Sequence, residues 1–209
     1  MLISYKIQSK IYGLLDIIYF RKKSLNPRYM LINKIPNNNL NILEIAVGTA
    51  KNSILLAENK PNVKITGIDL SKEMLKIAQK TIKKNNISNI ELLTMDGTNM
   101  TFENETFDFI IVSLLLHELP ENLSDRVLYE CSRVLKNKGK IYVIEWERPK
   151  KIIEKILFFT IELFEPRNFR QFLAKDLNEY FNKNGLRIET TEYGDYSKVM
   201  ELSKSATSK

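Results

Sequence analysis

This chain alternates short apolar runs with segments whose apolar residues recur at helical spacing. Runs of strand length occur at residues 41–47, 63–69, 90–96, 107–116 and 140–146. Helical periodicity lies between them at residues 51–59, 71–86 and 122–139. Strands that alternate with helices are joined by right-handed crossovers, which make the strands parallel and cover both faces of the sheet. The pattern therefore predicts a doubly wound α/β fold with a mostly parallel sheet.

The two ends of the chain complete one domain with a seven-stranded sheet. Helical spacing at residues 5–20 and 24–35 predicts a helical N-terminal cap, and residues 151–164 and 175–184 predict two further helices. The last apolar runs, "LRIETTEYG" and "YSKVMELSK", predict a C-terminal hairpin. We expect a cap over residues 1–39, a central core over 40–147, an insertion acting as a lid or interface over 148–174, and the last helix and strands over 175–209.

Composition excludes several classes of protein. Lys and Arg outnumber Asp and Glu by 32 to 25, but the lysines are scattered and no basic run interleaved with aromatic residues appears, so we expect no nucleic-acid partner. The single cysteine, Cys131, excludes a disulfide framework and a thiolate metal cluster and favours a reducing compartment. No signal peptide and no membrane-spanning apolar stretch is evident, so we expect a cytoplasmic protein.

The turn after the first predicted strand, in "NILEIAVGTAKNS", is the expected ligand site. Ligands of open parallel sheets bind beyond the carboxyl ends of the strands, where the strand order reverses. Gly48 lets the backbone approach a ligand closely there. The dinucleotide fingerprint needs two more glycines than this turn contains, so a pyrophosphate group fits poorly.

The stretch "LEIAVGTAKN" resembles motif I of the class I S-adenosylmethionine-dependent methyltransferases. Three further stretches, "ITGIDLSKEMLKIAQK", "MDGTNMTFENETFDFIIVSLLLHEL" and "ECSRVLKNKGKIYVIEWERP", keep the order and spacing of that family over residues 40–148. The resemblance is greatest to the small-molecule methyltransferases of ubiquinone and menaquinone biosynthesis. Ala46 and Ala50 replace the first and third glycines of the motif, which tightens the turn without forbidding it.

The resemblance implies S-adenosylmethionine as the cofactor and residues 40–147 as the cofactor-binding core. The activity it implies is transfer of a methyl group to a small-molecule acceptor by in-line displacement (EC 2.1.1.-). In this family Asp69 would accept both ribose hydroxyls, Asp96 would recognise the adenine amino edge, and Glu44 would order the turn. The cofactor-binding residues implied in this way are Tyr12, Glu44, Ala46, Gly48, Asn52, Asp69, Leu70, Met74, Asp96, Gly97, Ser113 and Leu114.

Several of these residues also have a purely structural interpretation. Asp96 followed by glycine can form an Asx turn, Asn52 can be the exposed start of a helix, and Tyr12 can be a core residue of an amphipathic helix. The helix that follows Asp69 does not need that carboxylate as a cap, because Ser71 offers one.

His117, the single histidine, is the candidate general base for an acceptor that keeps its proton. An equally good interpretation is a histidine that packs beside the adenosine or bonds the backbone. One histidine and one cysteine make a zinc site improbable. A metal-dependent mechanism would need an acidic ligand after the fourth predicted strand, where Ser113 stands instead, so we expect no metal.

Two other functions remain open on the same architecture: a non-catalytic module that binds S-adenosylmethionine, and a nicotinamide-dependent oxidoreductase. The sequence leaves the identity of the acceptor open, because acceptor pockets are built from variable caps and insertions. The apolar segment 151–164 is a candidate lid, dimer face or membrane-surface contact.

Overall fold

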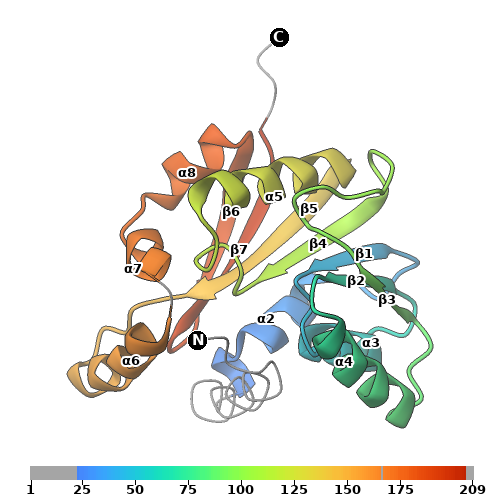
Figure 1. Ribbon diagram of the computed structural model, residues 1–209, viewed down its shortest axis with the longest axis horizontal. Coiled ribbons are helices and arrows are strands. Elements are labelled where there is room, and N and C mark those ends of the chain that lie inside the picture. The colour runs from blue at the N-terminus through green and yellow to red at the C-terminus, as the bar shows by residue number, and fades with distance from the viewer. Residues whose placement is uncertain (1–22, 166, 206–209) are drawn as a thin grey trace.

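The computed structural model describes residues 23–165 and 167–205 and contains the expected seven-stranded sheet (Figure 1). The strand order is β3-β2-β1-β4-β5-β7-β6. Strands β1 to β5 are parallel to one another, and β7 runs antiparallel to both β5 and β6. The strands are β1 (Asn41–Ile45), β2 (Lys64–Asp69), β3 (Ile90–Thr94), β4 (Phe107–Ser113), β5 (Leu135–Trp146), β6 (Leu186–Tyr193) and β7 (Ser197–Lys204).

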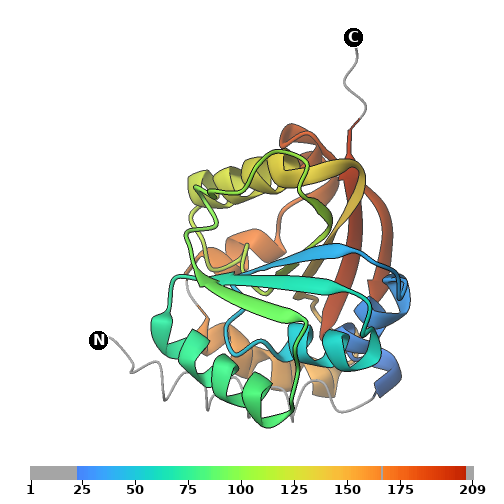
Figure 2. The same ribbon diagram turned by 90° about the vertical axis from the view of Figure 1, so that its right-hand side faces the viewer.

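Helices cover both faces of this sheet, as Figures 1 and 2 show. Helices α2, α3 and α4 lie on one face, and α5 and α8 lie on the other. The helical elements are η1 (Lys23–Leu25), α2 (Pro27–Lys34), α3 (Lys51–Asn59), α4 (Lys72–Lys84), α5 (Glu121–Val134), α6 (Ile152–Phe164), α7 (Arg167–Leu173) and α8 (Leu177–Lys183). The doubly wound fold is thus confirmed, whereas the helix expected at 5–20 lies outside the described residues.

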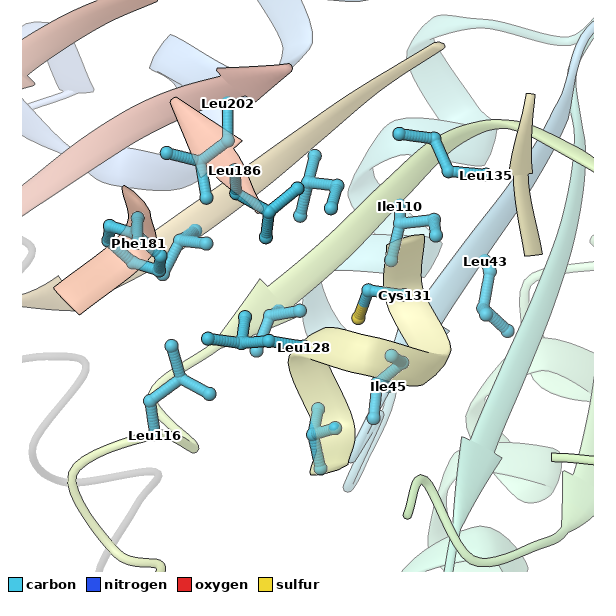
Figure 3. Close-up of a cluster of buried hydrophobic side chains, with 14 of the residues drawn as sticks. Leu43, Ile45, Ile110, Leu116, Leu128, Cys131, Leu135, Phe181, Leu186 and Leu202 are labelled. Atoms are coloured by element: carbon cyan, nitrogen blue, oxygen red, sulfur yellow. The ribbon is translucent and has the colours of Figure 1, made fainter. Parts of the chain in front are cut away.

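Alternation along β1 assigns its side chains to the two faces of the sheet. Leu43 and Ile45 pack with Leu128 and Cys131 of α5 in the larger core cluster (Figure 3). Ile42 belongs to the cluster on the opposite face, where α2 and α3 pack. Burying one such aliphatic side chain contributes about 1.5–3 kcal/mol, so these two layers hold β1 at the centre of the sheet.

The two helices that follow β1 and β2 begin in different ways. Ser71 caps α4 as expected, because its hydroxyl accepts a hydrogen bond from the Met74 N–H at 3.2 Å. The N-cap residue of α3 is Ala50, which makes no side-chain cap. In the first turn of α3 the Ser53 N–H bonds the Glu44 carboxyl instead.

Helix α5 ends earlier than the sequence predicts, at Val134 and not at Gly139. The chain becomes extended at Leu135, and a register irregularity follows before β5 pairs regularly with β4. A Cβ on Gly139 would lie 2.7 Å from the backbone oxygen of Asp108 and 2.6 Å from Leu135 Cδ1. Gly139 thus lies within β5, where it permits close approach of two strands, and not at the end of a helix. The sequence also missed the short helix α7.

Replacement of Gly139 by alanine should therefore destabilise the chain by about 1–3 kcal/mol, the usual cost of overpacking. Urea denaturation of Gly139→Ala would measure the change. Gly185→Ala is the matched control: its φ is +71° and nothing lies within 4 Å of a built Cβ, so only about 1–2 kcal/mol of left-handed strain is expected. A Gly139→Ala variant as stable as the parent chain would contradict the close-approach explanation.

Candidate active site

A cavity of about 440 Å³ opens at the carboxyl ends of the parallel strands, where the strand order reverses between β1 and β4. Its walls come from the β1–α3 turn, from the residues after β2, β3 and β4, and from α2, α5 and the end of β5. The lining residues are Arg28, Glu44, Ile45, Ala46, Val47, Gly48, Thr49, Lys51, Asn52, Asp69, Leu70, Ser71, Met74, Met95, Asp96, Gly97, Thr98, Ser113, Leu114, Leu115, Glu118, Leu119, Leu123, Val127 and Trp146.

In the β1–α3 turn, every second residue has its backbone in the left-handed region. The φ angles are 52° at Ala46, 54° at Gly48 and 59° at Ala50. These are the three positions at which motif I of the resembling family carries glycine, the residue that adopts this region without strain. The alanines therefore fit the turn at a cost of about 1–2 kcal/mol each.

Asp69 closes this turn from the neighbouring strand. One carboxylate oxygen accepts the Gly48 N–H and the other accepts the Ser71 N–H, each at 2.8 Å. Both oxygens are thereby fixed in direction at the cavity wall. Each carboxylate oxygen can accept a further hydrogen bond, which leaves capacity for a ligand with two adjacent hydroxyls.

Glu44 is buried, with 1% of its surface exposed, and anchors a polar network behind the turn. Its carboxylate accepts hydrogen bonds from Asn52 Nδ2 at 2.7 Å and from the Ser53 hydroxyl. Asn52 Oδ1 in turn accepts a hydrogen bond from Arg28 Nε at 2.9 Å. Asn52 is therefore a buried link between Glu44 and α2, not the exposed start of a helix.

Burial raises the pKa of the Glu44 carboxyl above its ordinary value of 4.5. The hydrogen bonds from Ser53 and Asn52 and the charge of Arg28 act in the opposite direction without cancelling this shift. A carboxyl with a raised pKa in the folded chain holds its proton more tightly when folded, so its contribution to stability is lost as the pH rises above 4.5.

Glu44→Gln should reveal this dependence, because the amide does not titrate. We expect the free energy of unfolding of the variant, relative to the parent chain, to increase as the pH is raised from 4.5 toward neutrality. Urea denaturation at several pH values would measure both curves. If the difference in free energy of unfolding between the two proteins stays constant across that pH range, the raised pKa of Glu44 is contradicted.

Asp96 forms the Asx turn that the sequence allowed. Its Oδ1 accepts hydrogen bonds from both the backbone N–H and the hydroxyl of Thr98, each at 2.8 Å. Gly97 is required by close packing, because a Cβ there would lie 2.8 Å from Ile45 Cγ2. Both residues line the cavity, so the turn is compatible with a ligand role that remains a prediction.

The other predicted cofactor residues are also at the cavity, with one exception. Leu70 and Met74 line it beside Asp69, and Ser113 and Leu114 line it at the end of β4. Tyr12 lies outside the described residues.

The structure does not support the predicted general-base role of His117. Its ring is 1% exposed and is not part of the cavity wall. Nδ1 lies 2.5 Å from Glu145 Oε2, and Nε2 lies 3.4 Å from Glu165 Oε2. Burial lowers the pKa of the imidazole, but the two carboxylates outweigh it and raise the pKa to about 10. A buried ring that is protonated at neutral pH does not accept a proton from a ligand in the cavity.

Sequence reasoning missed several cavity residues, notably Arg28, Glu118 and Trp146. Arg28 comes from the N-terminal helix α2, and no local pattern connects it to the turn. Trp146 ends β5, so the rule that ligands bind beyond strand ends could have found it. Glu118, which directly follows His117, lines the cavity, whereas His117 does not.

Comparison with known proteins assigns this chain to a family. A family model described as a methyltransferase domain matches residues 42–139. The demethylmenaquinone methyltransferase of Listeria welshimeri is 30% identical over 167 residues, which cover 79% of this chain and 69% of that protein. The chain belongs to the class I S-adenosylmethionine-dependent methyltransferases, enzymes that here transfer the methyl group of S-adenosylmethionine to a small molecule.

Solved structures agree with this assignment of the fold. A methyltransferase structure from Methanococcus maripaludis has a TM-score of 0.74 and 22% identity, over 99% of this chain and 97% of that one. One from Aquifex aeolicus has a TM-score of 0.71 and 21% identity, over 93% and 96%. The family membership sets aside the oxidoreductase and the non-catalytic module that the sequence had left open.

Proposed function

We propose that S-adenosylmethionine binds across the carboxyl ends of β1 and β2 with its ribose at Asp69. The observation that carries this proposal is the carboxylate held by two backbone N–H groups at the turn, since its direction is set before any ligand arrives. Such preorganisation lowers the entropic cost of binding.

The two ends of the cofactor have complementary surroundings on either side of Asp69. The cofactor's carboxylate fits near Arg28 and the N-terminus of α3, because both favour negative charge. Its adenine fits between Asp96 and the apolar side chains of Leu70 and Met74. In this proposed arrangement the sulfonium lies near Ser113 and Leu114 at the end of β4, both of which line the cavity.

The acceptor pocket that we propose lies beyond Leu114, where Leu115, Leu119 and Trp146 offer apolar walls. Walls of this kind suit a flat aromatic molecule. We therefore propose a quinone-class acceptor of the kind that the relatives' name, demethylmenaquinone methyltransferase, denotes. The protein's task is to align the acceptor's nucleophile opposite the departing sulfur and to exclude water.

Asp69→Asn tests the cofactor site. An amide offers one acceptor oxygen to two backbone N–H groups, so we expect S-adenosylmethionine affinity to fall about 10- to 100-fold, as for loss of a hydrogen bond to a charged group. Calorimetry with S-adenosylmethionine and its demethylated product would measure the change. Asp108→Asn is the matched control, because its carboxylate also accepts a backbone N–H, from Asn41 at the opposite end of β1.

Equal affinity in Asp69→Asn and the parent chain would contradict the proposed ribose site. The same preparation can test the acceptor with cofactor labelled at the methyl group and a reduced demethylmenaquinone analogue. If the protein binds the cofactor and transfers label to a non-quinone metabolite but not to the quinone, the proposed acceptor class is wrong. The proposed cofactor site would then still stand.

We further propose that α6 contacts an anionic membrane surface. Ile152, Ile156, Phe159 and Leu163 are 77%, 67%, 51% and 61% exposed, and their spacing places them on one face of the helix. Figure 1 shows α6 beyond the carboxyl end of β5, the strand whose last residue, Trp146, lines the cavity. Lys150 and Lys155 are exposed beside this face, which suits negatively charged lipid.

Described residues contain no helix long and apolar enough to cross a membrane, so a surface contact is the kind of association that α6 can make. The cytoplasmic location expected from the sequence stays a prediction.

Vesicle flotation would test α6. The parent chain should float with vesicles containing phosphatidylglycerol, less at high salt, and the double variant Ile156→Glu with Phe159→Glu should lose most of this binding. Tyr129→Glu, which replaces a 67% exposed aromatic residue on α5, should bind as the parent does. A parent chain that forms a dimer broken by the double variant, and that ignores vesicles, would show that α6 is a dimer face instead.

A further inference from the structure

Three side chains with metal-binding atoms meet beside the acceptor pocket. His117 and Glu118 come from the loop after β4, and Glu165 follows the last residue of α6. One ligand atom of each lies within 4.8 Å of the others. Ligands that share one ion at about 2.0–2.2 Å stand roughly 3–4 Å apart, so small side-chain rotations would close the set.

The imidazole of His117 provides an observation that is independent of the two carboxylates. The side chain is 99% buried, and its Nε2 has no hydrogen-bond partner within the described part of the chain. Glu165 Oε2, at 3.4 Å, is close enough for an ion pair but does not complete a hydrogen bond. A buried nitrogen without a hydrogen bond carries an energetic cost that an ion would remove.

Contacts on the other side of the His117 ring fix the direction in which Nε2 points. Glu145, itself buried, lies 2.5 Å from Nδ1 through Oε2 and accepts the Leu116 N–H at 2.9 Å through Oε1. The edge of the ring meets Phe169 at a centroid distance of 5.2 Å. A carboxylate on one imidazole nitrogen, with the other nitrogen directed at further ligands, is the arrangement in which metal-binding histidines are usually held.

We propose that His117, Glu118 and Glu165 bind a divalent transition-metal ion. Imidazole together with carboxylates suits Zn²⁺ or Mn²⁺ better than Mg²⁺, which prefers oxygen ligands alone. Binding would use the neutral ring and release its proton. The sequence argued against a metal from its single histidine and cysteine and from Ser113 after the fourth strand. Glu165 was not considered, because it lies far along the chain from His117 and only the fold brings the two together.

The site would also have a role in the reaction. Glu118 lines the cavity, so an open position on the ion would face the proposed acceptor. A bound ion lowers the pKa of an oxygen ligand and would thereby help to deprotonate the acceptor. This role rests on the proposed function, whereas the metal site does not.

Metal binding by the full chain, dialysed against chelator, is the test. Calorimetric titration with ZnCl₂ and with MnCl₂, followed by elemental analysis, should show one ion per chain, with weaker binding of MgCl₂. Glu165→Gln should weaken binding at least about tenfold, and Glu118→Gln likewise. Glu162→Gln is the matched control on α6, since its carboxylate pairs with Arg148 and Arg170 outside the cluster.

S-adenosylmethionine affinity, measured on the same proteins, distinguishes loss of the metal site from loss of the fold or of the cofactor site. The metal-free chain and Glu165→Gln should bind the cofactor as the parent does, which shows that both are folded. Absence of stoichiometric Zn²⁺ or Mn²⁺ binding by a chain that binds the cofactor would overturn the metal site alone. Equal metal affinity in Glu165→Gln and the parent chain would also overturn it.

Discussion

The site depends on one interaction, the acceptance of the Gly48 and Ser71 N–H groups by the two oxygens of Asp69. The hydrogen bond from Gly48 joins the β1–α3 turn to the end of β2, and the one from Ser71 fixes the orientation of the Asp69 carboxylate. Without the hydrogen bonds to Asp69, the start of α3 and the polar groups of the cavity wall would not keep their orientation. The packing of β1 between two helical layers supplies the rigid base that the interaction needs.

Behind the turn, the buried Glu44 connects the site to the N-terminal part of the chain. A lone carboxylate inside a sheet would be costly, and here Asn52, Ser53 and Arg28 share that cost through hydrogen bonds and charge. Helix α2 therefore contributes to the cavity wall as well as to the core. The same principle recurs at Glu145, which positions both the Leu116 N–H and the ring of His117.

Local sequence patterns predicted the regular helices and strands. They failed where contacts between distant segments determine the end of a helix or the surroundings of a side chain. Periodicity and turn chemistry predicted the hairpin of β6 and β7, the cap at Ser71 and the place of Gly48 at the cavity, and the family resemblance implied that of Asp69. The end of α5 was not predicted, because the approach of Gly139 to Asp108 is a contact between strands. His117 was misjudged for a similar reason, since its partners Glu145 and Glu165 lie on β5 and at the end of α6.

The sequence by itself determined the doubly wound architecture and the position of the ligand turn, because these depend on periodicity and spacing along short stretches, and the family resemblance identified Asp69 beside that turn. Only the tertiary structure decided which groups face the cavity and which are buried behind it. Arg28 and Glu118 line the cavity, whereas His117 lies behind its wall. The burial of a side chain and the charge around it depend on neighbours from many segments of the chain. No single stretch of sequence therefore determines them.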